Sequence, residues 1–406
     1  MSTAPPQVSS KLFGLFCLAS YLLSLSYGST FLLSLLIGSR GGNEHDAGSV
    51  ISAAMLSTFA AVIVSGHLSD WLGAARSIAL FGVLLVAASL GFALTPGFGH
   101  LLLFFGLLLF FGLLLGLGWG VFYTLGPIIV ASLVTPAQRA RYFALLSGSM
   151  MTGIGSGPLL GRAASALGYP VTAAFYLAAL ASLIGVVLFW RLDAQLKKAP
   201  SPTAAVARIS WRATRQILSS RAVFPILMVG LGGCVFGGLS SFQTSYAASR
   251  SLDYSLFFFG FMGAAISSRM VIAGFVVKRD PFRASCLLSG LMTVSIVMFS
   301  FVVDSGLSYV LAAMMLGVGY GLTYSVINGL AANEAPHGTT AQALLLFSLS
   351  YFIGVFGFPL LAGKIIVEHG MATLLLTVLA VALLNWLITV GRLIWRRYTV
   401  KTLQEA

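Results

Sequence analysis

The chain has 406 residues, of which 58% are hydrophobic and only 8% are charged, and its mean hydropathy is +0.97. Ordinary soluble domains carry about 25% charged residues, and disordered chains need low hydrophobicity, so the composition argues against both classes. A net charge of +13 fits a nucleic-acid partner, but long apolar runs rich in Gly and aromatic residues are typical of helices in a bilayer. The composition therefore predicts an all-α membrane protein with several transmembrane helices.

Apolar runs long enough to cross a bilayer occur twelve times along the chain. The fourth run exceeds one straight span, and its Gly and Pro residues at 116–127 predict a kink or a tilt. The predicted spans are 12–37, 47–68, 77–95, 101–133, 139–161, 170–191, 222–247, 255–277, 284–302, 306–333, 340–363 and 371–395.

An even number of spans places both termini on the same side of the membrane, and basic residues indicate which side. With the N-terminus inside, the inner segments hold 18 Lys and Arg residues, whereas the outer loops hold four, Arg40, Arg162, Arg250 and Lys364. The positive-inside rule then predicts cytoplasmic termini in a bacterial inner membrane. Because this asymmetry explains the net charge, contact with anionic lipid is expected and a nucleic-acid partner is not.

The basic segment between spans six and seven divides the chain. We expect a six-helix bundle at 1–192, a cytoplasmic basic linker at 193–220 and a second six-helix bundle at 221–406. Within the linker, Arg208–Arg221 is expected to form a basic amphipathic helix on the membrane surface. The Cys and His residues lack metal-ligand spacing, so no metal, cofactor or catalytic site is predicted, and the protein is not expected to be an enzyme.

The two halves repeat when the sequence is shifted by 201 residues. Gly116–Tyr123 then falls on Gly317–Tyr324, and Ser147–Leu160 matches Ser348–Leu361 at six positions. The same register thus holds across two separate spans, pairing span four with span ten and span five with span eleven. Such a parallel duplication is typical of transporters built from two halves around a midplane binding site.

Two motifs combine regularly spaced Gly residues with charged residues or Pro. The first comprises Gly66, Asp70, Gly73 and Arg76, between spans two and three, and the second comprises Gly153, Gly157, Pro158 and Gly161, in span five. The first resembles the G-x-L-x-D-x-x-G-x-x-R signature of the major facilitator superfamily, although Ala74 and Ala75 stand where basic residues are usual. The second resembles that superfamily's antiporter signature, found mostly in exporters, and the chain as a whole resembles the small twelve-helix bacterial efflux members.

Both motifs are interpreted as gating elements. Asp70 is expected to cap span three at a tight turn and to exchange contacts between conformations; the alternative is a static turn residue. The Gly residues of span five allow close helix approach and bending; the alternative is helix packing without gating.

Polar and aromatic residues on inward-facing spans form the candidate substrate site. The resemblance implies that spans one, four, seven and ten line a cavity between the halves. Tyr320, Tyr324 and Asn328 share one face of span ten at i, i+4 and i+8. Trp119 and Tyr123 are their repeat mates, and Tyr27 and Gln243 are the candidates from spans one and seven. A packing stripe of aromatic residues is the competing interpretation.

Charged residues are almost confined to the ends of spans. Every carboxylate lies there, which leaves Glu334, near the inner end of span ten, as the candidate proton carrier. Arg269 is the one charged residue well inside a predicted span. It is interpreted either as a structural residue that hydrogen-bonds neighbouring backbone or as a binding site for a substrate anion.

Together these patterns predict an alternating-access secondary transporter, expected as a monomer, with a small-molecule substrate and the lipid bilayer as partners. Export of a small organic molecule, with proton coupling as an option, is favoured by the span-five motif. The alternatives are a facilitative or exchange importer of an organic anion and a non-transporting membrane scaffold or sensor.

Overall fold

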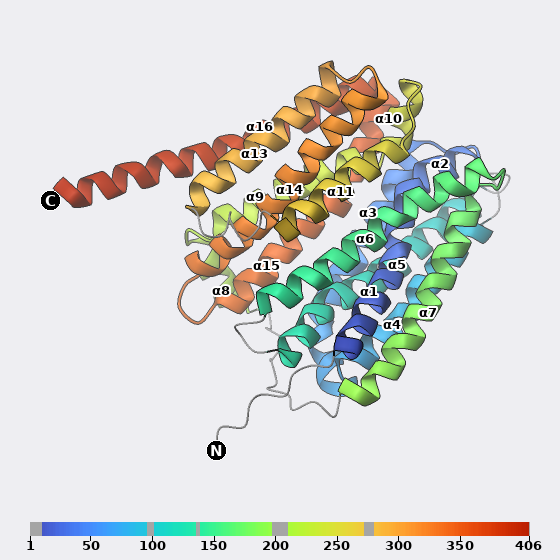
Figure 1. The fold of residues 1–406 in the computed structure, drawn as a ribbon, viewed down its shortest axis with the longest axis horizontal. Coiled ribbons are helices and arrows are strands. Elements are labelled where there is room, and N and C mark those ends of the chain that lie inside the picture. The colour runs from blue at the N-terminus through green and yellow to red at the C-terminus, as the bar shows by residue number, and fades with distance from the viewer. Residues whose placement is uncertain (1–9, 96–100, 135–138, 197–209, 272–279, 406) are drawn as a thin grey trace. The chain divides into compact units, whose positions relative to one another are not determined.

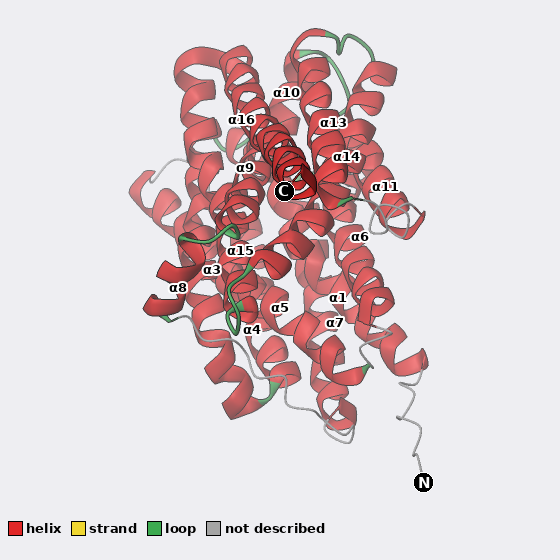
Figure 2. Ribbon diagram, turned by 90° about the vertical axis from the view of Figure 1, so that its left-hand side faces the viewer, coloured by secondary structure: helices red, strands yellow, loops and turns green. Residues whose placement is uncertain are grey.

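The computed structural model describes residues 10–95, 101–134, 139–196, 210–271 and 280–405. Within these ranges all regular elements are helices and none is a strand (Figure 2). The chain divides into two compact units, Met1–Arg208 and Ile209–Ala406.

Unit 1 is a helical bundle in which chain order is easily followed (Figure 1). Its elements are α1 (Ser10–Ser29), η1 (Thr30–Leu32), α2 (Leu33–Gly38), α3 (Glu44–Leu72), α4 (Ala74–Leu94), α5 (Leu101–Leu133), α6 (Arg139–Ala166) and α7 (Thr172–Leu196).

Unit 2 begins with a short amphipathic helix and continues with a second bundle. Its elements are α8 (Trp211–Leu218), α9 (Val223–Ser240), α10 (Gln243–Ser249), α11 (Ser255–Val271), α13 (Pro281–Phe301), α14 (Gly306–Glu334), α15 (Thr340–Phe352), the π-helical turn η3 (Ile353–Gly357) and α16 (Phe358–Glu405).

The predicted count of twelve spans is confirmed. In the described part of the chain, ten helical segments are long and apolar enough to cross a membrane, and the last of these, Thr340–Arg396, has 57 residues. The helix in that segment is interrupted at Gly370, whose φ of 84° lies in the region that favours glycine. Dividing it there and adding α11 gives twelve membrane helices, six in each unit.

Spans one and seven differ from the uninterrupted helices predicted for them. The first passes through the 3₁₀ turn η1, and the seventh is interrupted at Ser241 and Phe242 between α9 and α10. Both interruptions are rich in hydroxyl residues, and the Thr30 hydroxyl donates to the Tyr27 carbonyl. Ser and Thr side chains can compensate backbone carbonyls in this way, which hydropathy alone does not reveal.

The units share one packing pattern, which explains the sequence repeat. In unit 1, α5 packs between α3 and α4, and in unit 2, α14 packs between α11 and α13. Gly116 lies against the backbone of α3, as its mate Gly317 lies against α11. Gly118 and its mate Gly319 lie against α4 and α13 on the other side. The repeated G-x-G-x-G pattern thus brings two neighbours close to one helix.

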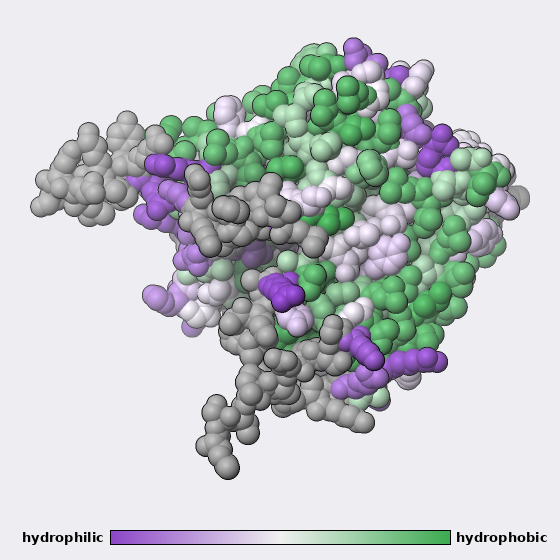
Figure 3. Space-filling view, in the orientation of Figure 1, coloured by the Kyte–Doolittle hydropathy of each residue, from purple (hydrophilic) through white to green (hydrophobic). Residues whose placement is uncertain are grey.

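Outward-facing side chains are those expected next to lipid. Leu56, Leu180 and Leu287 are each more than half exposed. In Figure 3 hydrophobic residues cover much of the visible flank of each unit, and hydrophilic residues gather toward helix ends.

Candidate functional site

The first predicted gating motif spans the junction of α3 and α4. Gly66 is buried in α3, and Asp70 is exposed in the last turn of that helix. The N-cap of α4 is Gly73, with φ of 87°, and no side chain caps the helix there. The α3 helix continues past Asp70 to Leu72 and the turn is made at Gly73, so the N-cap residue of α4 is Gly73 rather than Asp70, and the gating role of Asp70 stays a prediction.

Arg76, in the first turn of α4, forms an ion pair with Asp193, near the end of α7. The Arg76 Nε donates to the Asp193 Oδ2 at 2.6 Å, and the guanidinium lies 5.9 Å from the centre of the Trp190 ring. The Asp193 side chain is only 5% exposed, whereas that of Arg76 is 49% exposed. Asp193 begins the segment predicted to be the linker, but it lies within α7, which continues to Leu196.

The second predicted gating motif forms the contact of α6 with α1. A Cβ on Gly153 would lie 2.7 Å from the Ser24 Cβ, and one on Gly157 would lie 2.6 Å from the Ser29 amide nitrogen. Gly161 faces Leu32 in the same seam, and Pro158 is buried within α6. The motif therefore lets two helices approach until their backbones nearly touch.

The predicted aromatic residues of unit 1 are brought together. Tyr27 stacks on Trp119 with ring centres 4.7 Å apart and planes at 24°. Trp119 also contacts Tyr123, at 6.0 Å between ring centres. Tyr27 and Trp119 are buried, whereas Tyr123 is half-buried. A residue of α1 and two residues of α5 thus form one cluster.

The corresponding residues of unit 2 cluster around Tyr351, which the sequence interpretation did not include. The Tyr320 hydroxyl donates to the Tyr351 hydroxyl at 3.1 Å, and the Tyr324 ring meets the Tyr351 ring edge-on at 5.3 Å. Tyr320 also stacks on Phe236 of α9 at 4.8 Å. Tyr320 is therefore a packed residue, whereas Tyr324 and Asn328, further along the same face, are half-buried.

Gln243 lies apart from these tyrosines. Its Oε1 accepts a hydrogen bond of 2.6 Å from the Tyr309 hydroxyl, and its side chain is fully buried. Because Tyr309 precedes Tyr320 by eleven residues of α14, the two levels are separated by roughly 16 Å along the helix axis. Gln243 marks the helix break in span seven, not the aromatic cluster.

Arg269 reaches from α11 to the helix that carries the predicted substrate face. Its Nε donates to the Gly321 carbonyl at 3.2 Å, one residue after Tyr320. Gly321 has no side chain to cover that carbonyl, which makes the contact sterically accessible. A half-buried guanidinium that donates to a neighbouring backbone carbonyl is the arrangement that the structural interpretation of Arg269 anticipates, and its role in anion binding stays a prediction.

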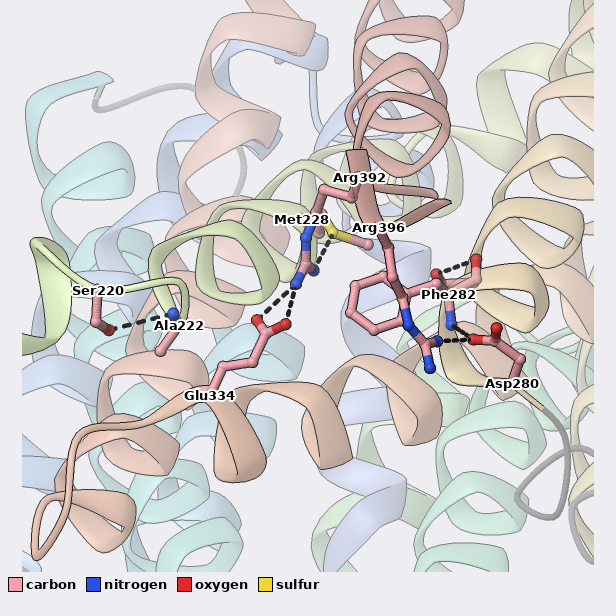
Figure 4. Close-up of polar contacts among 9 residues, drawn as sticks. Ser220, Ala222, Met228, Asp280, Phe282, Glu334, Arg392 and Arg396 are labelled. Atoms are coloured by element: carbon pink, nitrogen blue, oxygen red, sulfur yellow. Dashed lines mark hydrogen bonds and ion pairs between the residues drawn. The ribbon is translucent and has the colours of Figure 1, made fainter. Parts of the chain in front are cut away.

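Glu334, the predicted proton carrier, forms an ion pair with Arg392 of α16 (Figure 4). The Arg392 Nη2 contacts both carboxylate oxygens, with 2.5 Å to Oε2, and the two side chains are 8% and 14% exposed. Burial raises the pKa of the Glu334 carboxyl, and the Arg392 guanidinium beside it opposes that rise. Phe224 and Phe282 pack against the guanidinium at 5.4 and 5.0 Å. No group of metal-ligating side chains occurs in the described residues.

The family model of the Major Facilitator Superfamily matches residues 13–359. This chain belongs to the major facilitator superfamily. It is therefore a secondary transporter rather than an enzyme, with a small-molecule substrate and a place in the lipid bilayer. The family model covers most of the chain and includes both sequence motifs, so it supports their resemblance to signatures of this superfamily.

Solved structures of other transporters share the fold. A crystal structure of the peptide transporter POT in complex with sulfate aligns with a TM-score of 0.71 and 18% identity, covering 95% of this chain and 96% of that chain. The human organic anion transporter MFSD10 aligns with a TM-score of 0.69 and 16% identity, covering 94% of this chain and 100% of that chain. At these identities the likeness shows the fold. No curated protein matches the sequence.

One polar face of this transporter was missed by the sequence interpretation. Asn385, Thr389, Arg392 and Arg396 follow one another at i, i+4, i+7 and i+11 on α16, and the first three are buried. Thr389 hydrogen-bonds Ser289 of α13 at 3.0 Å, and Arg396 pairs with Asp280, the N-cap of α13. The helical spacing of four polar residues in an otherwise apolar span was the available signal.

Proposed function

We propose that this transporter exports a small organic molecule across the bacterial inner membrane. The contact of α6 with α1 is the observation that carries the proposal. The residues of the exporter-like motif in span five are those at which α6 meets the α1 backbone without an intervening side chain. Such a seam keeps two helices together while the unit moves as a body, as alternating access requires.

The aromatic clusters supply the binding surfaces in this proposal. In unit 1, the half-buried Tyr123 ring is tilted against the buried stacked pair of Tyr27 and Trp119, and in unit 2 the half-buried Tyr324 and Asn328 add a ring and an amide. Aromatic faces with few hydrogen-bonding groups suit planar or amphiphilic organic molecules, including cations, which bind to π-systems.

Proton coupling through Glu334 is the mechanism that we propose for driving export. Burial raises the pKa of the Glu334 carboxyl, which favours its protonation, and in this proposal protonation releases Arg392 from the pair. Glu334→Gln would remove the titrating group and keep the side-chain shape. If the pH dependence of flux is unchanged in this variant, Glu334 is not the carrier.

Flux of a panel of labelled compounds in proteoliposomes tests the proposal directly. Export predicts uptake into inside-out vesicles that increases when the lumen is acidic and collapses when the pH gradient is dissipated. Facilitated import predicts equilibration without any gradient, and a scaffold or sensor predicts no flux. Trp119→Leu, with Leu108 of the same helix changed to Ile as control, should weaken apparent affinity if the aromatic surface binds substrate.

Import or exchange of an organic anion is the second candidate, because Arg269 lies at the level of Tyr320. Two of the structural neighbours are described as an organic anion transporter and as a transporter crystallised with sulfate. Arg269→Lys should keep the charge but lose the planar fork that grips a carboxylate. Weaker substrate affinity at unchanged thermal stability would support the anion site, whereas unchanged affinity or unfolding would refute it.

Membrane orientation can be tested independently of the substrate. We propose cytoplasmic termini, from the asymmetry of Lys and Arg between the two sides of the membrane. A periplasm-active reporter fused at Pro200 should be silent, and one fused at Gly41, between α2 and α3, should be active. The opposite result would reverse the orientation and make the proposed direction of export untenable.

A further inference from the structure

A small cavity lies inside unit 2, where α9, α13, α14 and α16 meet. Met228, Met292, Tyr320, Thr323, Tyr324 and Asn385 are among the residues that line it. Its volume is about 10 Å³, at the lower limit of the space that one water molecule needs. It is far too small for an organic substrate, so it is not itself the substrate site, although Tyr320 and Tyr324 of the aromatic cluster contribute to its lining.

Two lining residues carry buried polar atoms that lack hydrogen bonds within the described protein. Asn385 is fully buried, and neither its Oδ1 nor its Nδ2 has a partner there. The Thr323 side chain is 4% exposed, and its Oγ1 also lacks a partner among the described atoms. Buried amides and hydroxyls are hydrogen-bonded in the large majority of cases, and in hydrocarbon the requirement is stronger still.

The chemistry of these atoms selects the ligand. Asn385 presents one acceptor and two donors, and Thr323 presents a hydroxyl that can act as either. A metal cation would satisfy only oxygen atoms and would leave the Asn385 amide nitrogen unpaired, and the cavity lining contains no carboxylate to balance its charge. A water molecule both donates and accepts, and it fits the volume.

We propose that this cavity binds one ordered water molecule that joins Asn385 of α16 to Thr323 of α14. The water donates to the Asn385 Oδ1, accepts from Nδ2 and forms a further hydrogen bond with the Thr323 hydroxyl. It links the same two helices that Glu334 and Arg392 link directly at the end of the bundle. Thr323 directly precedes Tyr324. The water-mediated hydrogen bonds therefore hold α14 beside its half-buried aromatic face, and such bonds can break and re-form.

Met228 and Met292 allow a direct test, because each is 1% exposed and lines the cavity. X-ray radiolysis converts bound water to hydroxyl radicals, which oxidise the methionines beside it. In the purified full-length transporter we expect both to be oxidised well above Met262, a buried methionine of α11 that is 5% exposed and does not line the cavity. Oxidation of both at the Met262 level would overturn the proposal.

A double-mutant cycle with Asn385→Leu and Thr323→Val tests the bridge itself. Each single change should lower the melting temperature by leaving the water with too few partners, and the double change should cost less than the sum. The double change should also reduce the oxidation of Met228 and Met292 to the level of Met262. If the two effects on melting temperature simply add, or if Asn385→Leu alone stabilises the protein, no water joins these residues.

Discussion

Arg76 and Asp193 join the beginning of α4 to the end of α7, and Asp280 and Arg396 join the beginning of α13 to the end of the apolar part of α16, with the charges exchanged. The third and sixth membrane helices of each unit are thus paired at the same end by one acid and one base. Both units thus have an ion pair at this position, but the base is on the third helix in unit 1 and on the sixth helix in unit 2. An ion pair in which one partner is buried tolerates inversion more readily than removal of one member, since removal leaves a charge uncompensated.

Breaking the first pair should destabilise unit 1. Asp193→Ala is expected to cost about 1–3 kcal/mol, the range for hydrogen bonds to charged groups, and to lower the melting temperature in detergent. The double variant Arg76→Asp with Asp193→Arg should recover part of that loss, because unit 2 already uses this polarity. If the exchanged pair is no more stable than either single variant, the contact is adventitious.

Arg40 is expected to stabilise the opposite end of α4. Its two Nη atoms donate to the Phe92 and Ala93 carbonyls at 2.8 and 2.7 Å, and Arg250 donates in the same manner to the Val303 carbonyl beyond α13. These are carbonyls at helix ends, where a positive charge also meets the negative end of the helix dipole. Arg40→Ala should cost about 1–3 kcal/mol.

The matched variant for Arg40 is Arg40→Lys, which keeps the charge but cannot reach two carbonyls with a planar fork. Its melting temperature should fall between those of the wild type and Arg40→Ala. Equal stability of all three proteins would show that the contacts with α4 contribute nothing.

The Glu334–Arg392 pair should respond differently to single and double substitution. Glu334→Leu leaves a buried guanidinium without its carboxylate and is expected to cost about 3–5 kcal/mol. Glu334→Leu with Arg392→Met should be much closer to the wild type, because Phe224 and Phe282 can pack against Met. Measuring chemical unfolding of the three variants checks this, and a double variant as unstable as Glu334→Leu would contradict it.

The close contact of α6 with α1 predicts a strong position dependence for Gly→Ala changes in one helix. Gly153→Ala should lower the melting temperature and transport rate, because the new methyl group would meet the Tyr21 backbone. Gly148→Ala is the matched control, since a Cβ there meets nothing within 4 Å. Equal behaviour of the two variants would show that α6 and α1 separate freely.

Asp70 tests gating at the turn between α3 and α4. Because it is exposed and is not the N-cap residue of α4, Asp70→Asn should change the free energy of unfolding by less than about 0.5 kcal/mol. If its charge exchanges contacts between conformations, the same variant should slow flux at equal expression. Unchanged flux would make Asp70 an ordinary turn residue.

The number of spans and the internal repeat followed from the amino-acid sequence alone. Hydropathy reports how far each helix runs through lipid, and the G-x-G-x-G patterns at Gly116 and Gly317 report where a helix must approach two neighbours. Both are local properties of the sequence, so they can be recognised without knowledge of the fold. The two family motifs could be recognised for the same reason, since the first spans one short turn between consecutive helices and the second lies within one helix.

Only the tertiary structure decided which polar residues meet. Arg269 finds a carbonyl 52 residues away on α14, and Glu334 finds Arg392 58 residues away on α16. Tyr351 joins Tyr320, whereas Gln243, grouped with it by sequence, lies at another level beside Tyr309. The periodicity of a helix determines which of its side chains share a face, but which helix lies opposite and at what height depends on the packing of the whole bundle.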